Sequence, residues 1–157
     1  MKTRILLVCM GNICRSPIAE GVVRATLDKA GLARDVEVDS AGTLGYHAGE
    51  PPDQRAQKAA ARRGYDISRQ RARRVKEADF LRYDMILAMD RDNLASLERF
   101  CPSEQRHRLG LFLDYARNIP DKEVPDPYYG GPEAFEHVLE LVENAAAGLV
   151  ETLRQQK

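Results

Sequence analysis

One short segment near the start of the chain combines a nucleophile with an anion-binding loop. It covers residues 9–17 and reads Cys-Met-Gly-Asn-Ile-Cys-Arg-Ser-Pro. Five residues, one of them glycine, separate Cys9 from Arg15, and a loop of that length can turn its backbone N–H groups toward one centre. The Cys9 thiolate would then lie beside a bound oxyanion, which the guanidinium of Arg15 binds as a planar two-pronged donor.

The residues on either side of this loop support the same interpretation. The apolar run Ile5–Val8 comes directly before it and predicts a strand, while Ser16-Pro17 predicts the start of a helix. The free N–H groups and the dipole of a helix N-terminus favour negative charge, so they would stabilise both a thiolate and a phosphate. The segment therefore predicts in-line attack on phosphorus through a phosphocysteine intermediate. The alternative is that Cys9 is a small buried residue at the end of a strand.

A second segment offers the proton donor that the first one lacks. Residues 124–132 read Val-Pro-Asp-Pro-Tyr-Tyr-Gly-Gly-Pro. The prolines on both sides of Asp126 restrict the backbone, so its carboxyl group is held on a rigid loop. A carboxylic acid can protonate the leaving oxygen of a phosphate ester, and Tyr128 and Tyr129 could line a slot for an aromatic leaving group. Without the cysteine loop, this segment would be more typical of an ordinary Asp-Pro turn.

These two segments, together with the chain length, resemble the low-molecular-weight protein tyrosine phosphatases. The resemblance runs the length of the chain, because residues 39–43 (Asp-Ser-Ala-Gly-Thr) and 84–90 (Asp-Met-Ile-Leu-Ala-Met-Asp) are also similar to family segments. It implies metal-free hydrolysis of phosphotyrosine in proteins, with no cofactor. In that reaction Cys9 would be the nucleophile, Arg15 the phosphate clamp, and Asp126 the general acid and then the general base toward water.

The resemblance also implies supporting residues around the loop. Ser16 would hydrogen-bond the thiolate, and Asn12 would brace the loop together with Ser40. Residues 44–49 would form one wall of the cleft, with Tyr46 against the substrate ring and His47 close enough to touch the ligand; the alternative is a surface turn with His47 as a bystander. Many members carry a histidine in that brace, within a Ser-His segment. The matching segment here is Ser68-Arg69, so Arg69 is expected to replace the histidine. The expected substrate-binding residues are Met10, Gly11, Asn12, Ile13, Cys14, Ser16, Tyr46, Tyr128 and Tyr129.

Two residues inside the loop have alternative interpretations. Related bacterial enzymes that act on phosphoarginine resemble this family but carry threonine where this chain has Ile13. An apolar branched side chain suits an aryl phosphate better and favours phosphotyrosine, although Ile13 could simply pack against the loop. Cys14 is either a small apolar residue at the helix start or, as in similar enzymes, a disulfide partner that protects Cys9 from irreversible oxidation. Cys101 is expected to be a passive buried residue.

Composition limits the classes of partner and the number of domains. A chain of 157 residues is long enough for one domain, residues 1–157, and too short to predict two. Lys+Arg and Asp+Glu both number 24, which predicts neither nucleic acid nor a membrane as a partner. The expected partners are phosphotyrosine-containing proteins, with inorganic phosphate or other oxyanions in the loop. A cytoplasmic location is expected, because no signal-peptide pattern or membrane-length apolar run occurs and a thiol stays reduced there.

Alternating apolar patterns and helix signals predict the fold class. Strands are expected at Ile5–Val8, Val36–Asp39, Met85–Met89 and Leu109–Phe112. Helices are expected at Pro17–Ala30, Pro52–Arg63, Asp90–Arg99 and Pro132–Leu153, with a shorter one at Lys76–Leu81. This order predicts an α/β fold: a single-domain, doubly wound, four-stranded parallel sheet with helices on both faces, of the flavodoxin-like kind. The Cys9 loop leaves the carboxyl end of the first strand, where such sheets bind ligands.

Like charges gather in two stretches. Residues 55–76 are locally basic, and Glu136, Glu140 and Glu143 form an acidic patch in the last expected helix. Two separate solvated faces are the simpler interpretation, while attraction of anionic phosphoprotein substrates by the basic stretch is the alternative.

Two other function classes fit the sequence less well. A thiol-coupled arsenate reductase would resemble the same fold and reuse the nucleophilic loop, but it needs further cysteines to pass a disulfide away from the nucleophile. Residues 75–95 contain none, and Cys101 stands alone. An adaptor that only binds phosphorylated partners would need neither Cys9 nor Asp126. A dinucleotide site is excluded because no Gly-x-Gly-x-x-Gly follows the first strand.

Overall fold

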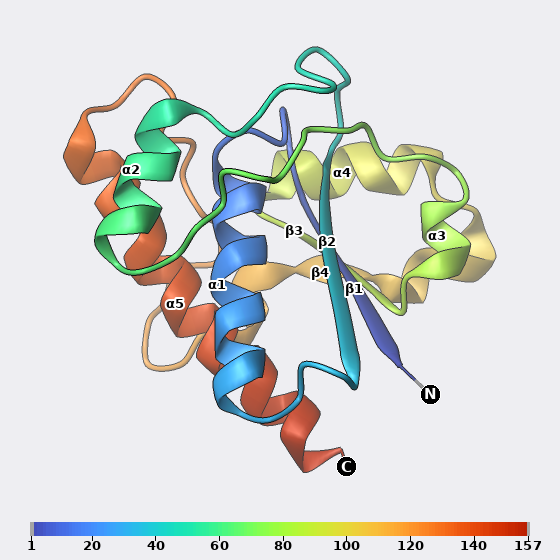
Figure 1. Cartoon of the computed structure of the whole chain (residues 1–157). Helices are drawn as coiled ribbons and strands as arrows, with labels where there is room; N and C mark the ends of the chain where they lie inside the picture. The colour runs from blue at the N-terminus through green and yellow to red at the C-terminus, as the bar shows by residue number, and fades with distance from the viewer. Residues whose placement is uncertain (1, 157) are drawn as a thin grey trace.

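The computed structural model describes residues 2–156, and helices and strands alternate along this part of the chain (Figure 1). The strands are β1 (Thr3–Cys9), β2 (Val36–Gly42), β3 (Met85–Ala88) and β4 (Leu109–Leu111). The α-helices are α1 (Arg15–Lys29), α2 (Gln54–Arg62), α3 (Asp79–Arg82), α4 (Arg91–Phe100) and α5 (Pro132–Gln155), and two short 3₁₀ helices, η1 (Ser103–Arg108) and η2 (Phe112–Tyr115), flank β4.

The four strands form one parallel sheet, as predicted, and their order is β2-β1-β3-β4. The chain runs from β1 outward to β2 and then crosses over to β3, so the strand order reverses between β1 and β3. A crevice opens at the carboxyl ends of the strands at such a reversal. Cys9 is the last residue of β1 and pairs in register with Gly42, the last residue of β2. The predicted nucleophile therefore lies at this crevice.

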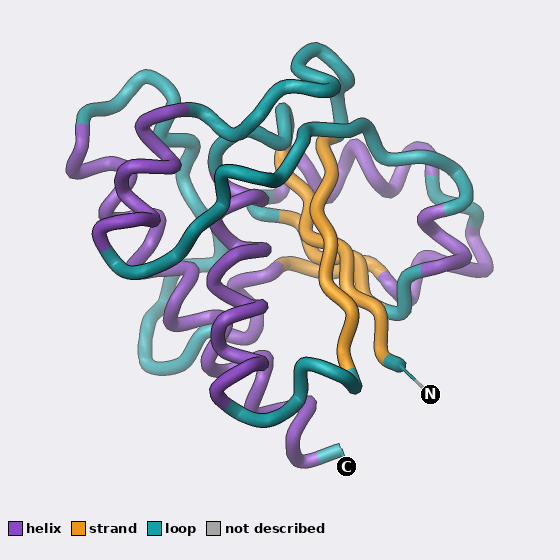
Figure 2. Tube along the Cα trace, in the orientation of Figure 1, coloured by secondary structure: helices purple, strands orange, loops and turns teal. Residues whose placement is uncertain are grey.

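Helices cover both faces of the sheet, as predicted (Figures 1 and 2). The side chains of β1 alternate between two cores, because successive residues of a strand point to opposite faces. Ile5, Leu7 and Cys9 pack in the core that α1 and α5 cover, whereas Leu6 and Val8 pack in the core on the side of α3 and α4. Burial on both sides explains why this strand reads as an unbroken apolar run.

The longest helix, α5, packs along α1 and passes close to η2. Its buried residues recur three or four positions apart, and they include Phe135, Val138, Val142 and Leu149. A β-carbon added to Gly148 would overlap the carbonyl oxygen of Tyr115, so only glycine lets the two backbones approach this closely.

The basic and acidic stretches meet instead of forming two separate solvated faces. Arg63 forms ion pairs with Glu136 and Glu143, and the hydroxyl of Tyr65 donates to Glu143 at 2.6 Å. Burial and this hydrogen bond raise the pKa of Tyr65 to about 12. These contacts join the end of α2 to α5. None of the helices within residues 2–156 combines the length and apolar character needed to cross a membrane.

Candidate active site

The loop between β1 and α1 curls around the sulfur of Cys9. The backbone N–H of Asn12 donates to Cys9 Sγ at 3.3 Å, and the hydroxyl of Ser16 lies 3.0 Å from the same sulfur. Asn12 has a φ of 59°, in the left-handed region that asparagine adopts more readily than most residues. Donors directed at one sulfur stabilise its anionic form.

The helix after this loop begins earlier than the sequence predicts. Ser16-Pro17 was expected to start it, but α1 begins at Arg15 and Cys14 occupies the capping position without a side-chain cap. The hydroxyl of Ser16 is unavailable as a cap because it contacts Cys9 Sγ and accepts a hydrogen bond from Asn12. Ser16 therefore contacts the Cys9 sulfur and does not cap the helix.

A buried hydrogen-bonded brace holds Asn12 in place. Its Nδ2 donates to the hydroxyls of Ser16 (2.8 Å) and Ser40 (3.0 Å), and its Oδ1 accepts from the backbone N–H of Arg73 (3.0 Å). Ser40 in turn donates to Glu20 Oε1 at 2.7 Å. The structure thus brings Asn12, Ser16 and Ser40 together, in the arrangement that the resemblance implies. Glu20 and the Arg73 backbone complete the brace and were not expected from the sequence.

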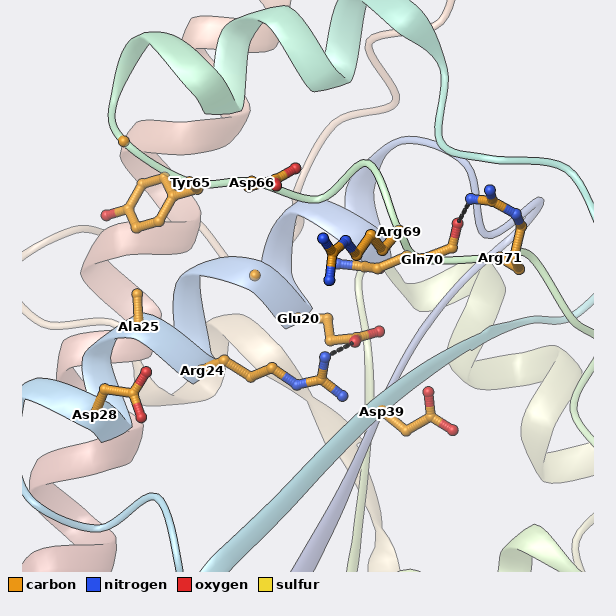
Figure 3. Close-up of a pocket in the computed structure, with 12 residues that line it drawn as sticks. Glu20, Arg24, Ala25, Asp28, Asp39, Tyr65, Asp66, Arg69, Gln70 and Arg71 are labelled. Carbon is orange, nitrogen blue, oxygen red and sulfur yellow. Dashed lines mark hydrogen bonds and ion pairs between the residues drawn. The ribbon is translucent and has the colours of Figure 1, made fainter.

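Arg69 does not take the place of the family histidine in this brace. Within residues 2–156 it makes no hydrogen bond to Asn12, Ser16 or Ser40, and it is exposed on the wall of a separate cavity of about 420 Å³ (Figure 3). Its neighbour Gln70 reaches α1 instead, donating to the carbonyl of Pro17 at 2.9 Å.

Glu20 connects the brace to that second cavity. One carboxylate oxygen accepts from Ser40, and the other forms an ion pair with Arg24 at 2.7 Å (Figure 3). Burial raises the pKa of Glu20, although the hydrogen bond from Ser40 and the charge of Arg24 oppose that rise.

Arg15 is fixed from behind by two acceptors. Its NH1 donates to Asp90 Oδ2 at 2.6 Å and to the carbonyl of Val124 at 3.0 Å, and only 3% of the residue is exposed. Burial by itself would lower the pKa of Arg15, but the Cys9 sulfur and the hydrogen bond with Asp90 more than offset it and the pKa is raised. Arg15 therefore stays charged and oriented.

Asp90 also belongs to this site, although the sequence patterns did not identify it as a candidate functional residue. Its other carboxylate oxygen, Oδ1, accepts from the backbone N–H of Asn93 at 2.7 Å and caps α4. It follows β3 at the same edge of the sheet where Cys9 ends β1. An acidic residue just after a strand, at the edge where such sheets bind ligands, was the signal that could have identified it.

Asp126 faces the same cleft from the loop before α5. Its Oδ2 lies 3.9 Å from Arg15 NH2, its Oδ1 accepts from the backbone N–H of Tyr128 at 3.1 Å, and its side chain is 41% exposed. Residues 9, 15 and 126 thus meet at one place, although the third is more than a hundred positions away from the others.

The cleft has a volume of about 390 Å³ and aromatic walls. Tyr46 is 86% exposed and packs edge-on against His47, while Tyr128 and Tyr129 form a second edge-on pair. Of the expected residues, Asn12, Ser16 and Ser40 do not line the cleft and belong to the brace; Leu44 and His47 join the lining. The lining residues are Cys9, Met10, Gly11, Ile13, Cys14, Arg15, Leu44, Tyr46, His47, Asp126, Tyr128 and Tyr129.

The three cysteines have free thiols and are all buried. Burial, followed by the charge of Asp53, raises the pKa of Cys14 far above its usual range, so this thiol stays protonated at neutral pH. Cys101 packs in the core on the other face of the sheet, as a buried residue. Residues 2–156 contain no cluster of three or more His, Cys, Asp or Glu side chains suited to a metal ion.

Comparisons with known proteins find relatives that match nearly the whole chain. Residues 4–157 match a family model described as low molecular weight phosphotyrosine protein phosphatase. A low molecular weight protein-tyrosine-phosphatase of Streptomyces coelicolor is 45% identical over 159 residues, covering 99% of this chain and 96% of that protein. The human low molecular weight phosphotyrosine protein phosphatase is 41% identical over 138 residues, or 85% of each chain. A crystal structure of a protein tyrosine phosphatase from Entamoeba histolytica, with Hepes in its active site, has a TM-score of 0.96 at 38% identity and covers 99% of both chains.

Proposed function

Because the chain belongs to the low molecular weight phosphotyrosine protein phosphatase family and is a protein tyrosine phosphatase, we propose that Cys9, Arg15 and Asp126 carry out its reaction. The observation that carries this proposal is their convergence in one cleft. The Cys9 sulfur accepts a hydrogen bond from the Asn12 N–H, Arg15 is oriented by Asp90, and Asp126 lies 3.9 Å from Arg15. No metal or cofactor has a role in the proposed mechanism.

The first proposed step transfers the phosphoryl group to sulfur. The Cys9 thiolate attacks phosphorus in line with the ester oxygen, so an S–P bond forms while the P–O bond breaks. Asp126, protonated at this stage, gives its proton to the leaving phenolate oxygen. Arg15 and the loop N–H groups stabilise the charge on the equatorial phosphate oxygens.

The second step releases phosphate. The Asp126 carboxylate takes a proton from water as that water attacks phosphorus, and the S–P bond breaks. The product is inorganic phosphate, the Cys9 thiolate re-forms, and Ser16 and the Asn12 N–H stabilise it as a leaving group through their contacts with the sulfur.

The walls of the cleft favour phosphotyrosine in proteins as the substrate. Ile13 lines the cleft with its apolar side chain, and Tyr46, Tyr128 and Tyr129 offer flat surfaces for an aryl ring. The Entamoeba relative holds Hepes, a sulfonate, in its active site, and we propose that inorganic phosphate and other oxyanions bind in the Cys9 loop. We also propose that the chain forms one catalytic domain and works in the cytoplasm, where its thiols stay reduced.

The positions of the cysteines argue against arsenate reduction. A reductase passes a disulfide from its nucleophile to further cysteines, but Cys101 is buried in the opposite core from Cys9 and Cys14. The sheet itself separates the two groups of thiols.

The test compares Cys9→Ser with Cys101→Ser, which removes a buried thiol outside the cleft. We expect Cys9→Ser to abolish hydrolysis of a phosphotyrosine peptide while vanadate still binds, and Cys101→Ser to remain active. Parallel assays with a phosphoarginine peptide and with arsenate check the substrate class. Activity retained by Cys9→Ser, or wild-type preference for phosphoarginine, would contradict the proposal.

A further inference from the structure

The loop that carries Asp126 is tied to the rest of the protein by an arginine from α2. Arg55 NH1 donates to the carbonyl of Tyr128 at 2.8 Å. Its guanidinium carbon also lies 5.2 Å from the ring centroid of Tyr128 and 5.0 Å from that of Phe135. Within the described residues, the other hydrogen bonds of residues 125–131 lie inside this loop or join it to α5, the helix that follows it directly.

Arg55 is itself oriented by Asp53. Its Nε donates to Asp53 Oδ1 at 3.1 Å and its NH2 to Oδ2 at 2.9 Å, so the planar guanidinium is held along one edge. The hydrogen bonds from Arg55 lower the pKa of Asp53, which keeps that carboxylate ionised. Asp53 also donates its backbone N–H to the carbonyl of Ile13 at 2.8 Å. The Asp53–Arg55 pair therefore connects two loops: residues 9–15, here called the nucleophile loop, and residues 125–131, here called the acid loop.

Tyr128 is the point at which this connection reaches the catalytic carboxyl group. Its carbonyl accepts from Arg55, while its N–H donates to Asp126 Oδ1 at 3.1 Å. With Oδ1 held in this way, Oδ2 is the oxygen that faces Arg15 and the cleft. A shift of the Tyr128 backbone would therefore change where the transferable proton is placed.

We propose that Arg55 is a positioning residue for proton transfer by Asp126. Its hydrogen bond to the Tyr128 carbonyl fixes the acid loop, and Asp53 fixes that hydrogen bond relative to Ile13 in the nucleophile loop. Besides the contacts that Arg15 makes with this segment, one series of contacts thereby connects the two loops and helps to set the distance between sulfur and proton donor: Ile13, Asp53, Arg55, Tyr128 and Asp126. This inference rests on the proposed general-acid role of Asp126.

The experiment measures kcat/KM over a series of aryl phosphates whose leaving phenols differ in acidity. A poor leaving group needs the proton in the transition state, whereas a good one departs without it. General acid catalysis contributes about 10²–10⁴-fold, and we expect Arg55→Ala to lose about tenfold on the poorest leaving groups and little on the best. A merely structural loss of folded enzyme would lower kcat/KM for every substrate by the same factor.

Arg62→Ala is the matched control, because Arg62 is an exposed arginine at the end of the same helix and its side chain makes no hydrogen bond or ion pair within residues 2–156. It should match the wild type across the series. Arg55→Lys keeps the charge but not the planar fork, so it should show the same trend as Arg55→Ala to a smaller degree. It also provides the test if Arg55→Ala does not fold.

A double variant separates the two proposals. If Arg55 acts through Asp126, adding Arg55→Ala to Asp126→Asn should cause no further leaving-group-dependent loss. If Asp126→Asn slows all substrates equally, the proposed general-acid role is wrong. If Asp126→Asn shows the leaving-group dependence but both Arg55 variants slow all substrates equally or not at all, the general-acid role stands and the inference about Arg55 is overturned.

Discussion

Replacement of Asn12 tests whether one side chain maintains the conformation of the loop between β1 and α1. Only 3% of this residue is exposed, and its backbone is in the left-handed region with φ 59°. Its side chain makes three hydrogen bonds, to Ser16, Ser40 and the backbone of Arg73. Asn12→Gly removes these bonds and keeps the backbone conformation accessible. Asn12→Ala removes the same bonds and adds a β-carbon that disfavours that conformation.

The size of each effect follows from these contacts. The two bonds donated by Nδ2 contribute about 1 kcal/mol each, and the partly buried Arg73 N–H left without its acceptor costs about 1–3 kcal/mol. We therefore expect Asn12→Gly to lose about 3–5 kcal/mol of the free energy of unfolding. Asn12→Ala should lose about 1 kcal/mol more because of its backbone conformation. Domains of this size have about 5–15 kcal/mol of stability, so a wild-type value in the upper part of that range leaves both variants folded.

Urea unfolding followed by circular dichroism measures these losses, and vanadate titration measures how well the loop still binds an oxyanion. Asn118 supplies the control, because it also has a positive φ, 64°, but lies exposed outside the cleft. Asn118→Ala should lose about 1 kcal/mol relative to Asn118→Gly, with vanadate affinity unchanged in both. Equal stability of Asn12→Gly and Asn12→Ala would refute the backbone argument. A loss below about 1 kcal/mol in both would refute the hydrogen-bond argument.

Three further variants test other parts of the structure. Folded Glu20 has a raised pKa and keeps its proton at a pH where the unfolded chain, with a pKa near 4.5, has released it. As pH rises from the pKa of unfolded Glu20 through the raised pKa of folded Glu20, the free energy of unfolding of the wild type should therefore fall relative to that of Glu20→Gln. Urea unfolding at several pH values measures this, and a difference between the two proteins that does not change with pH would contradict it. Gly148→Ala should lower the free energy of unfolding by about 2 kcal/mol or more through overlap with the Tyr115 carbonyl, despite the better helix propensity of alanine; a stabilised variant in the same assay would refute the close approach. Gly42→Ala would place a β-carbon 2.7 Å from the carbonyl oxygen of Met10, so vanadate affinity should fall, whereas wild-type affinity by titration would show that the loop tolerates the change.

Local sequence patterns were sufficient to predict the main helices and strands and the parallel type of the sheet. The alternation of apolar strand patterns and helix signals predicted a four-stranded parallel sheet with helices on both faces, and the structure confirms this fold class. The order of the strands came only from the structure. The start of α1 was predicted wrongly, because Ser16 is a good capping residue in isolation but its hydroxyl is used by Cys9 and Asn12. The capping preference of a residue says nothing about a competing hydrogen-bond partner that only the folded chain brings close.

The sequence by itself determined which reactive groups this protein carries in well-defined segments: a thiol, a guanidinium and a carboxyl group, each beside glycines, prolines or strand signals that define a local shape. Only the tertiary structure decided how these groups are held. Arg15 is oriented by Asp90, 75 positions away, and the Asp126 loop is tied through Tyr128 to Arg55, 73 positions away. Such partners carry no periodic or spacing signal, because parallel strands and their crossovers bring together residues whose separation along the chain is arbitrary.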